Sequence, residues 1–215
     1  MNRTEKLCKY LDCCESFADV GCDHGYCTRY MLDNKLCKTA VISDISAKCL
    51  AKAEKLLFSY IKSGAVTSVC CNGLEKIDES IEEILIAGMG GEELVSILKA
   101  AYIPRSFVLQ PMRNVRGVRE FLLSRGAQLT VDEPFECGGK FYYVIKGKRD
   151  GAFRPYTQAE LDFGQSLKSA ETKAYIRAEL EKKRLYLSRN LSEKARADIQ
   201  KQADYIKGVL DGEIE

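Results

Sequence analysis

Histidine is scarce in this sequence, and paired cysteine motifs are missing. His24 is the only histidine among 215 residues, and none of the ten cysteines falls in a Cys-x-x-Cys pair. Structural zinc sites are built from closely spaced cysteines and histidines, so this composition argues against such a site. Several cysteines lie in apolar runs, as at residues 69–71, where cysteine behaves as a small hydrophobic residue. We therefore predict free thiols in a reducing compartment and no bound metal.

Long apolar runs and an excess of one charge are also missing. A membrane-spanning helix needs roughly 18 or more consecutive apolar residues, and no such run occurs. The first six residues lack the apolar centre of a signal peptide, so we expect a cytoplasmic protein. The net charge is only +2, from 33 basic and 31 acidic residues. Any contact with nucleic acid would therefore depend on a local basic patch.

Apolar runs alternate with helical patterns up to Gly126, which predicts an α/β fold. We expect strands at residues 16–20, 39–43, 66–70, 83–87 and 106–110. We expect a first helix from about Thr4, with Leu7, Leu11 and Cys14 on one face, and a second over residues 26–33. A third is expected after a Ser46 cap and carries Leu50, Ala53, Leu57 and Tyr60. Two more are expected, one around Leu94, Ile97 and Leu98 and one around Val118, Phe121 and Leu122. The strands are continuously apolar, as in a parallel sheet covered on both faces.

The alternation stops after Gly126. Residues 128–133 and 140–146 form two strand patterns joined by Gly138 and Gly139, with no helix between them. A doubly wound sheet that finishes in an antiparallel hairpin is the arrangement of class I methyltransferases, which have a Rossmann-like fold. We therefore expect a first domain over residues 1–154 that binds S-adenosylmethionine.

The composition shifts again at about Pro155, after which no further proline occurs. Apolar residues then recur at roughly helical steps, at Leu180, Leu187, Leu191, Ala195 and Ile199. This predicts a coiled-coil-like C-terminal extension over residues 155–215, with two helices that break near residues 170–175. Eleven basic and eleven acidic residues from Tyr156 on balance each other. The extension is therefore a solvated helical hairpin, a clamp that helps grip an extended RNA, or both.

An acidic turn interrupted by glycines follows the first predicted strand, with the sequence Asp19-Val-Gly-Cys-Asp-His-Gly-Tyr26. Its glycines let the backbone approach a ligand closely, and the helix that follows leaves N–H groups free at its start. The three-glycine dinucleotide fingerprint is missing, and the carboxylates of Asp19 and Asp23 would repel a pyrophosphate. A ligand with a cationic end, such as S-adenosylmethionine, fits this charge pattern better.

Polar residues also follow the second and third predicted strands. Asp44 comes 23 residues after Gly21, a distance that suits hydrogen bonds to ribose hydroxyls, although an exposed turn aspartate is the alternative. Asn72-Gly73-Leu74 can offer an acceptor to the adenine amine and an apolar side chain to its ring, although Asn-Gly is also a common turn pair. Ligands bind at the carboxyl ends of the strands in such sheets, so we expect these residues in one pocket.

The fourth predicted strand ends in Ile86-Ala-Gly-Met-Gly-Gly91. Three glycines in four positions keep the backbone open to a ligand, and no lysine or hydroxyl residue follows as a phosphate-binding P-loop requires. Methyltransferases that act on exocyclic amines often have an Asn/Asp-Pro-Pro-aromatic motif at this place. That motif is absent here, which leaves methylation of a ring nitrogen open.

Two further sets of side chains are candidates for function. His24 lies in the first loop beside Asp23, where a structural hydrogen bond is the alternative to a catalytic role. Arg113, Arg116 and Arg119 follow the fifth predicted strand, where they either meet phosphates or form a solvated helix face.

Taken together, these motifs resemble the bacterial family of tRNA (adenine-22-N1)-methyltransferases. The resemblance is carried, in the expected order, by residues 19–26, residues 86–91, Gln110-Pro-Met112 and Gly139-Lys-Phe-Tyr142, and by the helical extension. It therefore covers nearly the whole chain. The sequence departs from the family at Cys27-Thr28, where Leu-Pro is usual, and at Asn72, where aspartate is usual. Asparagine keeps an acceptor oxygen, so contact with adenine is preserved.

The resemblance implies the transfer of a methyl group from S-adenosylmethionine to N1 of an adenine in the D-arm region of tRNA. We expect the protein to be a monomer. Neutral adenine N1 already carries a lone pair, so catalysis is expected to be mainly positional. The implied cofactor residues are Asp19, Gly21, Asp23, Gly25, Asp44, Ile45, Asn72, Gly73, Leu74, Ala87, Gly88, Met89 and Gly90. The implied substrate residues are Gly88, Gly91, Gln110, Arg113, Arg116 and Tyr142. Asp23, His24 and Tyr142 are the candidate catalytic residues, with Asp23 or His24 orienting the base or accepting an N6 proton afterwards.

Three other functions stay open at this point. The first is methylation of another RNA or of a small molecule, and the second is a non-catalytic RNA-binding protein that retains the fold. The third is a nicotinamide oxidoreductase, which the acidic first loop and the missing glycine fingerprint argue against.

Overall fold

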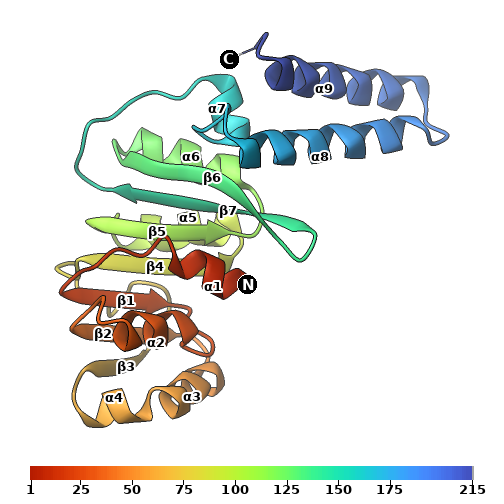
Figure 1. Cartoon of the computed structure of the whole chain (residues 1–215). Helices are drawn as coiled ribbons and strands as arrows, with labels where there is room; N and C mark the ends of the chain where they lie inside the picture. Colours follow the sequence, from red (N-terminus) through yellow and green to blue (C-terminus); the bar gives the residue numbers. More distant parts are fainter. Residues whose placement is uncertain (215) are drawn as a thin grey trace.

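A single mixed sheet forms the centre of the protein (Figure 1). The computed structural model describes residues 1–214, and its seven strands follow the order β3-β2-β1-β4-β5-β7-β6. The strands are β1 (Ser16–Val20), β2 (Thr39–Asp44), β3 (Val66–Cys70), β4 (Glu83–Met89), β5 (Ser106–Pro111), β6 (Gln128–Cys137) and β7 (Lys140–Lys148). The first five pair in parallel, whereas β7 is antiparallel to both β5 and β6. The predicted α/β sheet with a closing antiparallel hairpin is confirmed.

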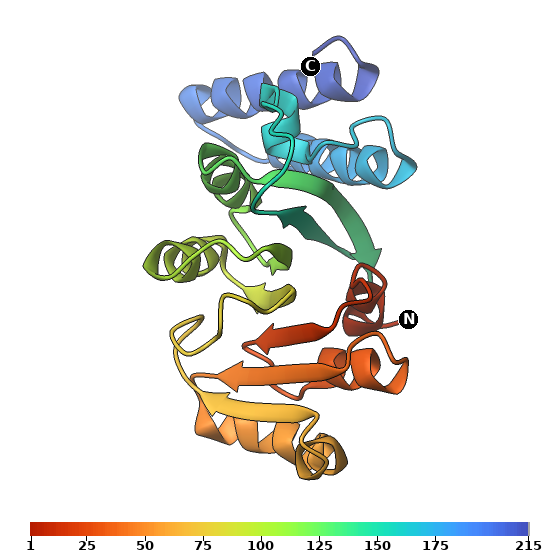
Figure 2. The ribbon, with the colours of Figure 1, turned by 90° about the vertical axis from the view of Figure 1, so that its left-hand side faces the viewer.

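Helices cover both faces of the sheet. The helices are α1 (Arg3–Cys8), α2 (Tyr26–Asp33), α3 (Ala47–Leu56), α4 (Phe58–Lys62), α5 (Gly91–Ala100), α6 (Val115–Ser124), α7 (Gln158–Phe163), α8 (Ala170–Leu187) and α9 (Glu193–Asp211). Figure 2 shows α1 and α2 on one face of the sheet and α5 and α6 on the other. Within residues 1–214, no helix combines the length and the apolar character needed to cross a membrane.

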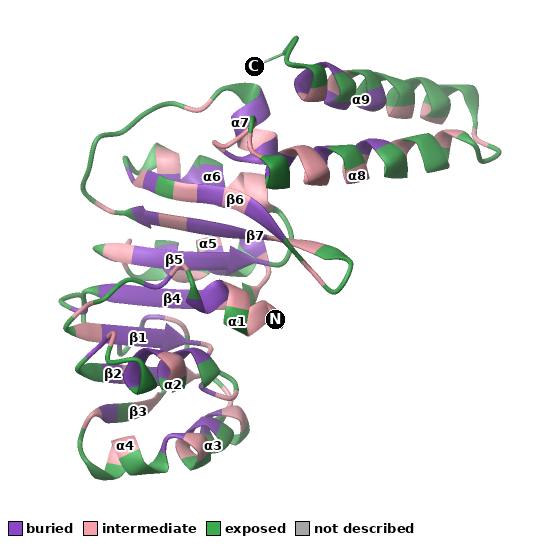
Figure 3. Ribbon diagram, viewed as in Figure 1, coloured by how far each residue is buried: buried purple, intermediate pink, exposed green. Residues whose placement is uncertain are grey.

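Each face of the sheet has its own hydrophobic core, because successive strand residues point in opposite directions. Phe17 and Val108 pack with α1, α2 and α3 in one core, whereas the neighbouring Ala18 and Leu109 pack with α5 and α6 in the other. Strand β3 at the edge is mostly intermediate or exposed, whereas the central parallel strands β1, β4 and β5 are buried along most of their length (Figure 3). Burial on both faces explains why their sequences are continuously apolar.

Two predicted helices are shorter than expected. The first ends at Cys8, so Leu11 and Cys14 lie in the segment that leads into β1, where Leu11 is still buried. The helix after Ser46 is interrupted at Leu57, whose φ of −102° and ψ of 14° lie outside the helical range, and continues as α4. Leu57 nevertheless has no solvent exposure, so the apolar spacing marked burial correctly but not helix length.

The prediction for the C-terminal segment was wrong in two respects. Residues 170–175 form the first turns of α8, which begins where the Ser169 side chain accepts a hydrogen bond from the amide of Thr172. The actual break lies between Leu187 and Glu193, and Ser192 caps α9 in the same way. A further short helix, α7, precedes both. Ile176, Leu180, Ala203, Ile206 and Val209 join Ala159 and Phe163 in a third hydrophobic cluster.

Candidate functional site

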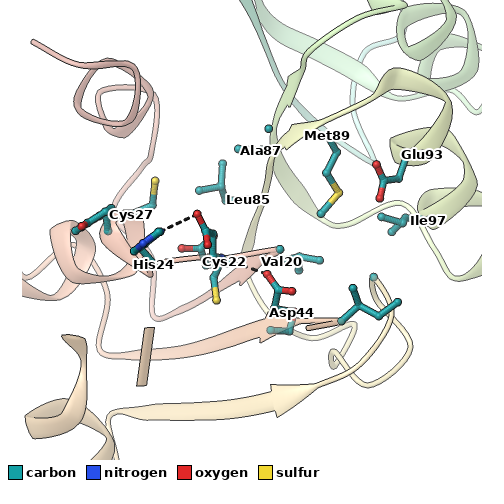
Figure 4. Close-up of a pocket in the computed structure, with 18 of the residues that line it drawn as sticks. Val20, Cys22, His24, Cys27, Asp44, Leu85, Ala87, Met89, Glu93 and Ile97 are labelled. Atoms are coloured by element: carbon teal, nitrogen blue, oxygen red, sulfur yellow. Dashed lines mark hydrogen bonds and ion pairs between the residues drawn. The ribbon is translucent and has the colours of Figure 1, made fainter. Parts of the chain in front are cut away.

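A pocket of about 550 Å³ opens at the C-terminal edge of the parallel strands (Figure 4). It lies where β1 is flanked by β2 on one side and β4 on the other, which is the usual ligand position in a doubly wound sheet. Predicted site residues that line the pocket are Asp19, Gly21, Asp23, His24, Asp44, Ile45, Asn72, Gly73, Ala87, Gly88 and Met89. The structure therefore brings together the loops after β1, β2, β3 and β4.

The loop after β1 is held against β2 by its own backbone. The amides of Gly21 and Cys22 donate to the carbonyl oxygen of Ser43 at 2.8 and 3.0 Å. Gly21 has a φ of +71°, and a Cβ atom there would collide with Cε of Met89. Gly21 is thus required both by the left-handed backbone and by the approach of the β4 loop.

Gly25 has a different role from the predicted one. It does not line the pocket, and a Cβ atom there would lie 3.0 Å from the Ala53 and Leu57 side chains. This glycine lets α2 begin close to α3, so its effect on the pocket is through packing.

Asp19 is a buried carboxylate at the end of β1, with 5% of its surface exposed. Thr28 donates its hydroxyl hydrogen to Oδ2 of Asp19 at 2.9 Å. Burial raises the pKa of Asp19 to about 6, against the lowering effect of the Thr28 hydrogen bonds and with a smaller contribution from the charge of Asp44. Thr28 is one of the two residues at which the sequence departs from the Leu-Pro pattern, so this departure supplies a partner for Asp19.

Asp44 connects the loops after β1 and β2. Its Oδ1 accepts a hydrogen bond from the amide of Ser46 at 2.8 Å, and its Oδ2 accepts one from the amide of Asp23 at 3.3 Å. The carboxylate is therefore held in one orientation at the pocket wall, as hydrogen bonding to a diol would require.

Asp23 and His24 form a paired group at the mouth of the pocket. Nδ1 of His24 lies 2.7 Å from Oδ2 of Asp23, and the ammonium of Lys52 lies 3.3 Å from Oδ1. Partial burial raises the pKa of Asp23, but the hydrogen bonds from His24 and Lys52 lower it more, so the net shift is downward. The His24 ring stacks on Tyr26, with centroids 5.5 Å apart and planes 5° apart. Asp23 is therefore an ionised carboxylate with two polar partners.

The predicted adenine-binding residues after β3 separate in the structure. Asn72 and Gly73 line the pocket, and Gly73, at a φ of +53°, leaves room for Ile97. Leu74 does not line this pocket, because its side chain is 3% exposed and packs in the core. The expected contact between Leu74 and an adenine ring is therefore not available in this conformation.

The glycine-rich end of β4 is irregular where it reaches the pocket. The register with β5 shifts between Ala87 and Met89, and Gly88 has a φ of +79°. Gly90 and Gly91 begin α5 and do not line the pocket. A Cβ atom on Gly91 would lie 2.5 Å from the backbone oxygen of Asn114, so this glycine serves helix packing.

Helix α1 closes one side of the pocket, which the sequence patterns did not indicate. Arg3, Thr4 and Leu7 all line the cavity. Nη1 of Arg3 lies 3.2 Å from Sδ of Met112, and its guanidinium lies 5.6 Å from the centroid of the Tyr142 ring. Glu93 also lines the pocket, although no motif singled it out.

Gln110 and Tyr142 lie beside the pocket without lining it. Gln110 is fully buried near the end of β5, and Tyr142 stacks on Phe135 with ring centroids 5.8 Å apart. Arg3 and Met112 therefore connect these two predicted substrate residues to the cavity.

The three arginines after β5 differ in what they can bind. Arg119 has no solvent exposure and pairs with Asp132, so both alternatives predicted for it, contact with phosphate and a solvated helix face, are wrong. Arg116 pairs with Glu120 at 2.8 Å and with Asp162 at 2.6 Å, which leaves little of its guanidinium free. Arg113 is 80% exposed and lies 3.7 Å from Glu92. Arg113 is the arginine of this group that is best placed to meet a phosphate.

All ten cysteines are free thiols. Among the described residues 1–214, no three histidine, cysteine, aspartate or glutamate side chains are grouped so that they could hold a metal ion.

Comparison with known proteins identifies the family. A family model described as a methyltransferase domain matches residues 1–145, which is more than half of the chain. The chain belongs to the methyltransferase-domain family. A Mycoplasma pneumoniae protein described as a "putative tRNA methyltransferase" is 31% identical over 155 residues, which cover 71% of this chain and 73% of that protein. The tRNA (adenine(22)-N(1))-methyltransferase of Bacillus subtilis is 28% identical over 162 residues, which cover 70% of this chain and 67% of that enzyme.

Solved structures share the fold of this methyltransferase over nearly its whole length. M. capricolum TrmK, solved with S-adenosyl-homocysteine, has a TM-score of 0.85 at 22% identity and covers 97% of this chain and 96% of its own. The B. subtilis M1A22 tRNA methyltransferase TrmK has a TM-score of 0.80 at 22% identity and covers 97% of each chain. The predicted class I methyltransferase fold is confirmed, and its helical C-terminal segment is part of the shared structure.

Proposed function

We propose that this methyltransferase transfers a methyl group from S-adenosylmethionine to N1 of an adenine in tRNA, at position 22 in the D-arm region. One observation carries the proposal: the acidic and glycine-rich loops after β1, β2 and β4 meet in one pocket of about 550 Å³. A cavity of this size is in the usual range for cofactor sites. The relationship to the B. subtilis enzyme supports the choice of tRNA and of adenine N1.

The residues of the pocket fit S-adenosylmethionine. Asp44 would accept hydrogen bonds from the ribose hydroxyls, and the amide oxygen of Asn72 would accept one from the adenine amine. Gly21 leaves the backbone open beside the buried carboxylate of Asp19, which suits a ligand that carries positive charge. When bound, the cofactor supplies an activated methyl group on a cationic sulfur.

Catalysis then depends on placing the acceptor base. A target adenine has to leave its stack so that its Watson–Crick edge faces the pocket. The open backbone at Ala87 and Gly88 gives that edge room to approach. Because N1 has a lone pair in neutral adenine, no residue has to remove a proton before the transfer. Asp23, held by His24 and Lys52, or His24 itself would orient the base or accept an N6 proton afterwards.

The C-terminal segment would serve the same substrate. We infer that residues 155–215 form a second domain that helps to hold tRNA beside the pocket of residues 1–154. Its third hydrophobic cluster gives it a core of its own, and α7 docks it onto α6 and β7. We also infer that the enzyme acts as a monomer in the cytoplasm, where its substrate is found. Light scattering after size-exclusion chromatography would reveal any stable dimer.

A methyl-transfer assay tests the function directly. Unmodified tRNA transcripts are incubated with the protein and labelled S-adenosylmethionine and then digested to nucleosides. We expect a 1-methyladenosine peak that disappears when adenine 22 is replaced by another base. A peak that survives this replacement would place the reaction at another adenine. Cofactor binding without transfer to any tRNA would mean that the substrate is different or that the protein only binds RNA.

A further inference from the structure

Gln110 has an unused hydrogen-bond acceptor in the interior beside the pocket. The side chain has no solvent exposure, and no group within residues 1–214 donates a hydrogen bond to its Oε1. A buried amide oxygen without a partner is costly, and such groups are uncommon in native structures. The oxygen is therefore available to a ligand that brings its own donor.

The other end of the amide is held in a fixed orientation. Nε2 of Gln110 donates one hydrogen to the carbonyl oxygen of Pro111 at 3.0 Å. Its remaining hydrogen points towards Sδ of Met112 at 3.5 Å, which is a weak acceptor. A flipped amide would place Oε1 against the Pro111 oxygen, so the observed orientation is the favoured one.

The free positions on this amide are an acceptor and a poorly used donor, side by side. Adenine presents the matching pair on its Hoogsteen edge, an N6 amine and the N7 acceptor, and glutamine binds this edge through two hydrogen bonds. The Watson–Crick edge would also offer a donor and an acceptor, but methylation at N1 requires that edge to stay free. Resting on the proposed function, we infer that Gln110 recognises the target adenine through N6 and N7 and thereby directs N1 towards the methyl group.

The same geometry selects adenine against guanine. Guanine carries an O6 acceptor where adenine has its amine, and this oxygen would face Oε1 of Gln110. Reversing the amide would remove that repulsion only by creating another with the Pro111 carbonyl. The Pro111 hydrogen bond therefore converts an ambiguous amide into one that prefers adenine.

Met112 and Arg3 control access to this amide. The Met112 side chain is 46% exposed and contacts both Gln110 and Arg3 through its sulfur. Methionine has three rotatable side-chain bonds and can turn into solvent at small cost. A Cβ atom on Gly88 would lie 3.6 Å from Nη2 of Arg3. The Arg3 guanidinium also lies over the Tyr142 ring. When the base enters, Met112 moves aside, and Arg3 and Tyr142 remain as its walls.

A comparison of two substrates and two enzymes tests the inference. Transcripts carry adenine or 7-deazaadenine, which lacks the N7 acceptor, at the target position. Each is methylated by the wild type and by Gln110→Leu, which keeps the volume but removes both hydrogen-bonding groups. We expect the 7-deaza change to lower kcat/KM about 10-fold in the wild type and less than about 2-fold in Gln110→Leu. Any intrinsic effect of the 7-deaza change on N1 reactivity is common to both enzymes and cancels in the ratio.

Matched controls separate recognition from folding. Gln128 lies at the start of β6 and pairs with Lys148, at the end of the sheet away from the pocket. Gln128→Leu is therefore expected to respond to the 7-deaza change as the wild type does. Gln110→Leu should bind S-adenosylmethionine within about 2-fold of the wild type, because Gln110 does not line the cofactor pocket. If it does not bind, Gln110→Met gives the same comparison with an unbranched side chain.

The outcomes are distinct. An equal effect of the 7-deaza change in the wild type and the Gln110 variant would overturn the role of Gln110. So would a wild type that methylates both transcripts equally well. A wild type that produces no 1-methyladenosine on the unmodified tRNA would count against the proposed function itself, and the inference would fall with it.

Discussion

Arg119 of α6 and Asp132 of β6 form an ion pair without any solvent exposure. Nε of Arg119 lies 2.7 Å from Oδ2 of Asp132, and Nη2 lies 2.8 Å from Oδ1. Nη1 of the same guanidinium donates to the carbonyl oxygens of Leu161 and Asp162 in α7, at 3.0 and 3.2 Å. The pair therefore joins the sheet to the first helix of the C-terminal segment.

Replacing Arg119 should destabilise the protein strongly. Arg119→Met leaves the Asp132 carboxylate buried without its partner and removes the contacts to α7, so we expect a loss of about 3–5 kcal/mol in the free energy of unfolding. Urea unfolding measures this loss. Arg184→Ala is the matched control, because Arg184 pairs with Glu181 on an exposed helix face, and it should cost less than about 1 kcal/mol. Similar losses in the two variants would contradict the structural role of the buried pair.

Removing the Asp44 carboxylate should weaken cofactor binding. Asp44→Ala takes away the acceptor for the ribose hydroxyls, and we expect the Kd for S-adenosylmethionine to rise about 10- to 100-fold in calorimetry. Asp78→Ala is the control, because Asp78 accepts the same local hydrogen bond from the amide two residues later, at 2.8 Å, as Asp44 does. A similar Kd in both variants would show that Asp44 only stabilises the turn after β2 and does not bind the cofactor.

Asp23 should affect turnover. Asp23→Asn keeps the shape of the side chain and tolerates the positive φ of 46°, but it removes the negative charge. We expect kcat for tRNA methylation to fall about 10- to 100-fold. Asp33→Asn provides the comparison. Like Asp23, Asp33 has two polar side-chain partners, here Arg29 and Tyr60, but it lies outside the pocket. Unchanged turnover in both Asp23→Ala and His24→Ala would exclude a catalytic role for this pair.

Asp19 should make the stability of the ligand-free protein depend on pH. Its pKa is raised to about 6 in the folded protein, so the folded state binds a proton more readily than the unfolded state does. The resulting stabilisation is complete below the unfolded pKa of about 3.9 and is lost as the pH rises through about 6, by at most about 3 kcal/mol. The free energy of unfolding of Asp19→Asn, compared with that of the wild type, should therefore increase as the pH rises from 4 to 7. Urea unfolding across that range tests the sign, and a constant difference would contradict it.

Much of the site was predictable because its parts follow a regular architecture. The carboxyl ends of parallel strands meet at one edge, so Asp19, Asp44, Asn72 and Ala87 could be expected in one pocket from their places after successive strands. Strand and helix patterns depend on neighbouring residues, which the sequence displays directly.

Contacts between distant segments were decided only by the tertiary structure. Arg3 reaches the pocket because α1 packs against α2 and shares a hydrophobic core with Leu85 of β4 and Val108 of β5. No local pattern relates Arg3 to Met112 or Tyr142. The spacing of Arg113, Arg116 and Arg119 after β5 gave no sign that the last of them is buried against Asp132. The break between α8 and α9 lies before the Ser192 cap of α9, and the apolar spacing alone did not mark it. The sequence by itself therefore determined the fold family and the loops that form the pocket. Burial and long-range packing decided which polar side chains remain free to act, because a charge that finds a partner inside the protein is no longer available to a ligand.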